Sequence, residues 1–379
     1  MKIGITCYPV YGGSGVVATE LGKALARRGH QIHFISYQMP FRLGAVTDSI
    51  FFHEVGATTY PIFNNHPYSL ALSSKMVDVA RYEALDLLHV HYAIPHATSA
   101  ILARAILRSH GIEVPVVTTL HGTDITIVGQ DPTFAPVVTY SIDASDGVTA
   151  VSQALRKETY EAFGVTGEIT VIPNFVNVER FSRRPECDMH RRLCPKGEKV
   201  LVHVSNFRKV KNTPHVVQVF YNLRRRGLPV KLLLVGDGPD RTATEHLARE
   251  LCVHDHVRFL GKQDPVSGIL SLSDVFIMPS GLESFGLAAL EAMACGVPVV
   301  CSDIGGLPEL IAGSGAGFLC PLGDVAAFTD STAMLLEDDA LRARMAAAAR
   351  AHAIRHFDED IIVPQYEAYY DSVRARVTA

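Results

Sequence analysis

Two glutamates, Glu283 and Glu291, bound the otherwise apolar stretch ESFGLAALE. The sequence predicts a loop followed by a helix that begins near Phe285 and is closed by Gly296 and Pro298. Glu291 would lie roughly two turns into this helix, where a carboxylate is costly unless hydrogen-bond donors satisfy it. Sugar hydroxyls are such donors, whereas a phosphate would be repelled. We therefore expect sugars at both glutamates and phosphates between them, at the free amides of the helix start. A nucleotide sugar has that order of groups.

A basic loop, VSNFRKVKN, joins an earlier strand to a helix that begins near Asn212. It offers Asn206, Arg208, Lys209 and Lys211. A cation beside a helix N-terminus gains nothing from the helix dipole, but an anion held between the two benefits from both. The alternative is that these lysines are solvated surface residues.

Three loops in the N-terminal half carry further candidates. CYPVYGGSG passes from a strand to a helix through Gly13 and Ser14, and its glycines allow a ligand to approach the backbone closely. HVHYAIPH places Tyr92, and LHGTD places His121 and Thr123, at the carboxyl ends of strands. The alternative for the first loop is a tight turn with Ser14 near a helix cap. The alternative for His121 is a loop histidine that is hydrogen-bonded to the backbone. The first loop lacks the G-x-G-x-x-G pattern of a dinucleotide site.

Short β-branched runs alternate with helical patterns along the chain, which predicts an α/β fold of two Rossmann-like, doubly wound domains. We expect an acceptor-binding domain at 1–170 and a nucleotide-sugar-binding domain at 171–359, with the boundary near Pro173 and the ligands in the cleft between them. The amphipathic segment 360–379 either packs back on the first domain or caps its own.

The composition excludes some classes of partner. Of the 379 residues 20% are charged and the net charge is -4, so long-range attraction of nucleic acid or anionic membranes is not expected. The seven cysteines occur singly, without a C-x-x-C arrangement, and their odd number fits a reducing compartment. We expect no signal peptide and no membrane-spanning run. We expect a cytoplasmic protein without stable membrane association; homo-oligomerisation stays open.

The spacing of Glu283 and Glu291 within GLESFGLAALEAMACGVPVV resembles the signature of retaining glycosyltransferases of family four, and the resemblance continues through GGSG, HGTD and VGDGP to the final helix. It implies the two-domain arrangement called GT-B and a UDP-sugar donor. Lys211 would neutralise the UDP phosphates, Glu291 would bind the ribose and Glu283 a sugar hydroxyl. The remaining implied contacts are the amides of Phe285, Gly286 and Leu287 with the diphosphate and sugar, His121 beside the donor sugar, and Gly13 beside the diphosphate. Catalysis would rest on His121, Lys211 and Glu283.

Longer stretches, including TTLHGTDIT and VSNFRKVKN, resemble the branch of that family that moves N-acetylglucosamine from UDP-N-acetylglucosamine to L-malate, the first step of bacillithiol biosynthesis. Many relatives have an arginine where Asn206 stands; this branch shares the asparagine. Ser14, Tyr92 and Thr123 are the acceptor-binding candidates. The cation that reads the malate carboxylates is unassigned, Lys75 and Arg42 being candidates. The resemblance implies no cofactor and no metal, and we see no Asp-x-Asp motif placed to hold a divalent metal.

Other functions remain open. A lipid, sugar or inositol phosphate acceptor would keep the same donor site. A nucleotide-sugar epimerase shares the architecture, but ESFGLAALE is not its signature. Lys211, His121 and both glutamates argue against a noncatalytic sugar-nucleotide sensor.

Overall fold

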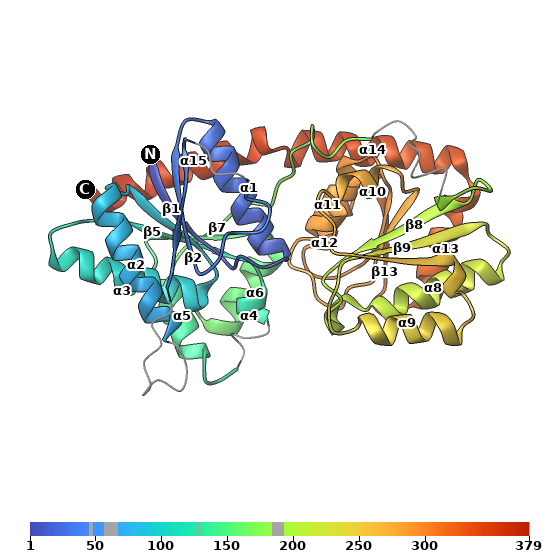
Figure 1. Ribbon diagram of the computed structural model, residues 1–379, viewed down its shortest axis with the longest axis horizontal. Helices are drawn as coiled ribbons and strands as arrows, with labels where there is room; N and C mark the ends of the chain where they lie inside the picture. Colours follow the sequence, from blue (N-terminus) through green and yellow to red (C-terminus); the bar gives the residue numbers. More distant parts are fainter. Residues whose placement is uncertain (45–47, 57–66, 127–128, 130, 184–192, 379) are drawn as a thin grey trace. The chain divides into compact units, whose positions relative to one another are not determined.

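The computed structural model describes residues 1–44, 48–56, 67–126, 129, 131–183 and 193–378. The chain forms two compact units, Met1–Asn174 with Ile362–Ala379 and Phe175–Ile361 (Figure 1). The C-terminal segment therefore belongs to the first unit. Within the described ranges, no helix combines the length and apolarity that crossing a membrane requires.

The first unit is built on a parallel sheet of order β3-β2-β1-β4-β5-β6-β7. Its strands are β1 (Lys2–Thr6), β2 (Gln31–Ser36), β3 (Ile50–Glu54), β4 (Leu87–His91), β5 (Val116–Leu120), β6 (Gly147–Ala150) and β7 (Ile169–Val171). Its helical segments are α1 (Gly13–Arg27), α2 (Tyr68–Glu83), η1 (Ala93–Ala97), α3 (Thr98–Ser109), α4 (Thr123–Thr126), α5 (Ala135–Asp143), α6 (Gln153–Phe163) and α15 (Glu359–Thr378).

The second unit repeats the plan with the order β10-β9-β8-β11-β12-β13. Its strands are β8 (Lys199–Val204), β9 (Val230–Val235), β10 (Val257–Gly261), β11 (Val275–Met278), β12 (Val299–Ser302) and β13 (Gly317–Cys320). Its helical segments are η2 (Lys209–Lys211), α8 (Thr213–Arg225), α9 (Arg241–Glu250), η3 (His254–His256), α10 (Ser267–Ser271), α11 (Leu287–Ala294), α12 (Leu307–Ile311), α13 (Val325–Glu337) and α14 (Asp339–Phe357).

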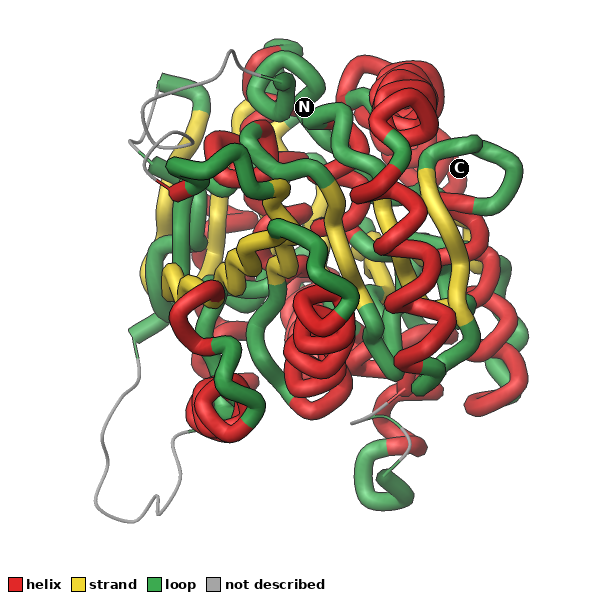
Figure 2. The backbone as a smooth tube through the Cα atoms, turned by 90° about the vertical axis from the view of Figure 1, so that its right-hand side faces the viewer, coloured by secondary structure: helices red, strands yellow, loops and turns green. Residues whose placement is uncertain are grey.

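Helices flank the strands of the two sheets, which explains the composition of the strands (Figure 2). β4 and β5 are buried along their whole length, as parallel strands covered on both faces are. In the first unit, α2 and α3 share a core with β1's neighbours β2 and β4, through residues such as Ile35, Met76 and Val90. In the second, α8, α9 and α13 pack on β8, β9 and β11 around Phe220 and Phe328.

The last helix, α15, packs on the sheet of the first unit. A Cβ at Gly147 would lie 2.7 Å from a methyl carbon of Val373, so only glycine fits where the helix crosses β6. Tyr370 Oη lies 2.8 Å from His89 Nδ1, and Arg374 forms an ion pair with Asp86. The sequence allows this helix to pack on the first unit or to cap the second. In the structure it packs on the first unit.

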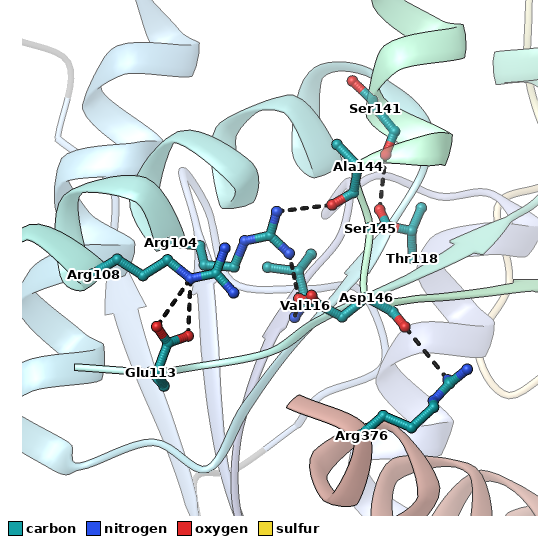
Figure 3. Close-up of polar contacts among 10 residues, drawn as sticks. All are labelled: Arg104, Arg108, Glu113, Val116, Thr118, Ser141, Ala144, Ser145, Asp146 and Arg376. Atoms are coloured by element: carbon teal, nitrogen blue, oxygen red, sulfur yellow. Dashed lines mark hydrogen bonds and ion pairs between the residues drawn. The ribbon is translucent and has the colours of Figure 1, made fainter. Parts of the chain in front are cut away.

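Asp146, directly before β6, is the centre of a polar cluster that connects several of these elements (Figure 3). Its carboxylate accepts hydrogen bonds from the Arg104 guanidinium on α3 and from the Val116 amide of β5, and its carbonyl accepts from Arg376 on α15. Arg104 also donates to the carbonyl of Ala144. The cluster satisfies buried polar groups on the side of the sheet opposite the carboxyl strand ends.

Candidate active site

Most of the candidate residues follow the strands at which each sheet reverses its order, and His121 and Thr123 follow β5, the neighbour of β4. In the first unit that point lies between β1 and β4, and in the second between β8 and β11. Loops outside the carboxyl ends of such strands form the usual ligand crevice of an open α/β sheet. Gly13 and Ser14 follow β1, Tyr92 follows β4, Lys211 follows β8 and Glu283 follows β11.

Ser14, Tyr92 and Thr123 come together, as a shared site requires. The Tyr92 hydroxyl donates to Ser14 Oγ at 2.8 Å, and the Thr123 side chain also hydrogen-bonds Tyr92. Tyr92 has a left-handed backbone (φ 89°), which turns the chain sharply from β4 into η1. Burial raises the pKa of the Tyr92 phenol to about 12, so this group stays a neutral donor at physiological pH.

His121 belongs to a chain of buried imidazoles. His91 Nδ1 lies 2.7 Å from His121 Nε2, so the pair shares one hydrogen, and His96 Nδ1 donates to the His91 carbonyl at 2.6 Å. Burial lowers the pKa of His121 to about 3 and that of His96 to about 4, and holds the pKa of His91 well below its ordinary value. These imidazoles are therefore neutral near pH 7. They present polar, uncharged nitrogens at the strand ends.

Asp124 organises the two histidine-bearing loops and was missed by the sequence reasoning. Its carboxylate accepts the amides of Ala93 (2.9 Å), Gly122 (3.0 Å) and His121 (3.4 Å). These bonds tie the loop after β4 to the loop after β5. Burial nevertheless raises the pKa of Asp124 to about 6. The available signal was an acid directly after HGT, where its side chain reaches the amides at the start of a short helix.

The two glycines that flank Ser14 have different surroundings. A Cβ on Gly15 would lie 2.5 Å from the Tyr8 carbonyl oxygen, so this glycine is required by packing within the unit. A Cβ on Gly13 would meet no atom within 4 Å in the described part of the chain. Packing inside the unit therefore gives no reason for glycine at position 13.

In the second unit, Lys211 and Glu283 form an ion pair. Lys211 Nζ lies 2.5 Å from Glu283 Oε2, and the two side chains are 20% and 14% exposed. The Gly281 amide donates to the Val210 carbonyl and fixes the loop after β11 to the loop after β8. A Cβ on Gly305, at φ 52°, would lie 2.0 Å from the Glu283 carbonyl oxygen, so the backbones pack directly there. The structure thus brings together two residues that lie far apart in the sequence.

Helix α11 begins two residues later than the sequence analysis predicts. Gly286 precedes it with a left-handed backbone (φ 97°), which only glycine adopts readily, and the first helical hydrogen bond runs from the Leu290 amide to the Gly286 carbonyl. The amides of the first turn, from Leu287 on, have no partner within the helix. Because of the later start, Glu291 lies one turn into the helix. The prediction that it lies roughly two turns into the helix is wrong. Its side chain is buried, at 5% exposure.

The other donor-site candidates contribute in different ways. Phe285 is buried and its ring packs edge-on against Phe357, which leaves its backbone for any ligand contact. Asn206 Oδ1 is buried and has no hydrogen-bond partner among the described residues. A Cβ on Gly238 would lie 2.0 Å from the Asn206 carbonyl oxygen, so the VGDG loop packs closely on this loop.

The two cation candidates for malate, Lys75 and Arg42, both lie in the first unit. Lys75 lies in the middle of α2, where its charge lowers the pKa of His53. The guanidinium of Arg42 lies over the Phe41 ring, and its carbonyl accepts from Lys23.

Comparison with known families accounts for almost the entire chain. The model of Glycosyltransferase Family 4 matches residues 11–180, and that of Glycosyl transferases group 1 matches residues 188–352.

Relatives of established name extend the likeness over the full length. The chain is 47% identical over 376 residues to N-acetyl-alpha-D-glucosaminyl L-malate synthase of Bacillus anthracis, covering 99% of this chain and 98% of the relative. It is 29% identical over 383 residues to phosphatidyl-myo-inositol mannosyltransferase of Mycobacterium leprae, covering 98% and 97%. Among solved structures, HepE of Anabaena in complex with UDP-glucose superposes with a TM-score of 0.81 at 22% identity, covering 98% of this chain and 100% of that one. This last likeness concerns the two-domain GT-B fold.

Proposed function

Because the chain belongs to the family 4 and group 1 glycosyltransferases, we propose that it transfers N-acetylglucosamine from UDP-N-acetylglucosamine to the hydroxyl of L-malate. The observation that carries the proposal is the 47% identity, over nearly the whole of both chains, to a relative named for that product. The reaction would be the first step of bacillithiol biosynthesis. Both substrates are soluble, so we propose that the enzyme acts in the cytoplasm.

The second unit is the proposed donor site. Lys211 neutralises the diphosphate, which lies at the free amides of the α11 start, from Gly286 and Leu287. Glu291, one turn further along, accepts the ribose hydroxyls, and Glu283 accepts a hydroxyl of the sugar. The Lys211–Glu283 pair supports this assignment, because it already sets a cation for phosphate beside an acceptor for a hydroxyl. Asn206 lies on the same loop, and its side-chain Oδ1 has no hydrogen-bond partner in the part of the chain that the structure describes.

The proposed reaction retains the configuration at the sugar. The oxygen of the acceptor hydroxyl forms a bond to carbon one on the face that the diphosphate leaves. The bond from carbon one to the phosphate oxygen breaks, and the hydroxyl proton passes to that phosphate oxygen. Lys211 stabilises the charge on the departing UDP, and His121, as a neutral imidazole, contacts the sugar without adding charge. No cofactor or metal takes part in this proposal.

The first unit is the proposed acceptor site, with Gly13 leaving room for the diphosphate. Ser14, Tyr92 and Thr123 are hydroxyl donors for the malate carboxylates. The raised pKa of Tyr92 supports this role, because the phenol keeps its hydrogen; that hydrogen, which goes to Ser14 Oγ in the structure, would turn to a carboxylate oxygen when malate binds. Fixed neutral donors orient the malate hydroxyl without requiring a charged partner on the same loops.

A second acceptor deserves a test, because the mannosyltransferase of M. leprae also matches over nearly the whole chain. The experiment measures UDP release from UDP-N-acetylglucosamine with L-malate, myo-inositol phosphate, phosphatidylinositol vesicles or monosaccharides as acceptor. We expect release to depend on L-malate and the product to be the α-anomer by NMR. UDP release only with an inositol acceptor would show that the acceptor is not L-malate. If no acceptor caused UDP release, the transferase proposal would be rejected.

A further inference from the structure

Two histidines and a glutamate, none of them among the candidate residues described above, meet at the edge of the first sheet. His33 is buried in the middle of β2, His53 lies on the edge strand β3, and Glu83 is the last residue of α2. His33 Nδ1 lies 2.9 Å from His53 Nε2, and one ligand atom of each of the three residues lies within 4.8 Å of the others. We propose that His33, His53 and Glu83 bind a divalent transition metal ion of the Zn²⁺ class, which ties the edge strand to β2 and α2.

The strand register explains why the histidines meet. His33 pairs with Phe51, and Ile35 pairs with His53, so both histidines lie on the face of the sheet that also carries Ile35. α2 covers this face through Met76 and its neighbours. The Phe51 ring stacks on the His33 ring with centroids 4.7 Å apart, which holds the imidazole in place. The cluster is thus set by rigid elements.

The protonation state of the histidines suits a metal ligand. Burial lowers the pKa of His33 to about 4, and burial also lowers the pKa of His53. Both imidazoles are therefore neutral near pH 7, the form that binds metal. Their facing nitrogens share one hydrogen, which moves to the other nitrogen of the same ring when a metal binds, so no net proton loss is needed.

The geometry requires a small adjustment. Two nitrogens on a tetrahedral Zn²⁺, each at about 2.0–2.1 Å, lie about 3.4 Å apart, so the imidazoles must separate by about half an ångström. Two imidazoles and a carboxylate leave a fourth position for water, the three-ligand arrangement that Zn²⁺ accepts.

Two lysines act against the metal and limit its affinity. Lys2 Nζ donates to the Glu83 carbonyl at 2.9 Å, and the charge of Lys75 acts on His53. The Glu83 carboxylate supplies the opposing negative charge. This charge offsets part of the lowering of both histidine pKa values by burial. The site is consequently expected to bind Zn²⁺ more weakly than a site of cysteines would.

The test measures Zn²⁺ binding to the metal-stripped, full-length protein in competition with a chromophoric chelator. The variants are His53→Asn and Glu83→Gln, both at half-buried positions, and the control is His110→Asn, which removes an exposed histidine of the same unit. We expect one Zn²⁺ per chain in the parent and in His110→Asn. Each of the two site variants should bind at least about tenfold more weakly, since loss of even an outer partner of a metal ligand costs about 10–100-fold.

Two further readouts separate a site from nonspecific binding. Co²⁺ should give the visible absorption of a tetrahedral ion, and Zn²⁺ should raise the Tm of the parent and of His110→Asn but not of His53→Asn. The melting curves without metal show that each variant is folded. The proposal would be overturned if the parent bound no stoichiometric Zn²⁺ or if the site variants bound Zn²⁺ as tightly as the parent. It would also be overturned if His110→Asn lost as much Zn²⁺ affinity as the site variants.

Discussion

The two units place polar groups at equivalent strand ends but differ in how these buried groups are stabilised. In the first unit the groups around His91, His96 and His121 are buried and neutral, because desolvation lowers the pKa of each imidazole. In the second, Lys211 and Glu283 keep opposite charges in contact. A charged partner suits the unit proposed to hold a diphosphate, and a neutral network suits the unit proposed to orient an acceptor. The same sheet topology therefore supports two kinds of chemistry.

The largest expected effect is on acid stability, and it separates the units. In the unfolded chain the histidines titrate near 6.5, whereas in the folded unit His89 and His121 titrate at about 3 and His96 at about 4. The unfolded state therefore binds more protons, and stability present above pH 6.5 is lost as the pH falls toward 4. The slope is about 1.4 kcal/mol per pH unit for each histidine.

Asp124 alone acts in the opposite direction, because burial raises its pKa to about 6 from 3.8. Between these two pH values the folded state binds the proton more tightly than the unfolded state does, so this group adds stability as the pH falls. In the second unit, among the described residues, His203 shows a comparable fall, to about 4. Hydrogen exchange followed by mass spectrometry at pH 7, 5.5 and 4.5 should show the first unit opening before the second. Earlier opening of the second unit would contradict the contrast between them.

The next largest effect concerns the charged unit. Lys211→Ala should lower kcat/KM for transfer by about 10³-fold, since it removes the cation proposed to stabilise the departing diphosphate. Lys209→Ala, an exposed lysine two residues away in η2, is the matched control and should be close to the parent. Both should keep the parental circular dichroism spectrum. Equal losses in the two variants would show that general positive charge, and not the position beside Glu283, matters.

A smaller effect is expected at the buried acid of α11. Glu291→Gln keeps the size of the side chain but accepts hydroxyl hydrogen bonds less strongly, so the Kd for UDP should rise about tenfold. Glu250→Gln, at an exposed position of the same unit, is the control. Isothermal titration calorimetry provides the comparison, and an unchanged Kd in Glu291→Gln would remove the ribose assignment.

Sequence patterns predicted most of this architecture for a physical reason. Strands buried on both faces produce apolar runs such as VKLLLV, which are visible without a structure. β3 and β13 were not predicted, because the residues of IFFHE and GFLC are mostly half-buried and the runs are short. The start of α11 depends on the left-handed backbone of Gly286, which a glycine permits but does not impose.

The candidate site was predictable only as far as its residue types. Lys211 and Glu283 were found because each follows a predicted strand, yet their contact depends on β8 and β11 being neighbours. The pairing of His91 with His121 similarly depends on the adjacency of β4 and β5. Asp124 was missed because its role comes from backbone amides of two loops, which leave no mark on the composition.

The smallest effect is expected in the neutral network. Tyr92→Phe removes the hydroxyl that donates to Ser14 but keeps the ring, so the KM for L-malate should rise about threefold to tenfold, matching the loss of one hydrogen bond of about 1 kcal/mol. Tyr82→Phe, at a tyrosine that is 82% exposed, is the control. Steady-state kinetics at saturating UDP-N-acetylglucosamine make the measurement. A fall in kcat with no change in KM would place Tyr92 in the chemical step instead.

A crystal structure of the protein with UDP tests the proposed donor site most directly. We expect diphosphate oxygens within about 3 Å of Lys211 Nζ and of the Leu287 amide, with the ribose hydroxyls on the Glu291 carboxylate. UDP bound at another place, with the Lys211–Glu283 pair and the start of α11 left without a ligand, would contradict it.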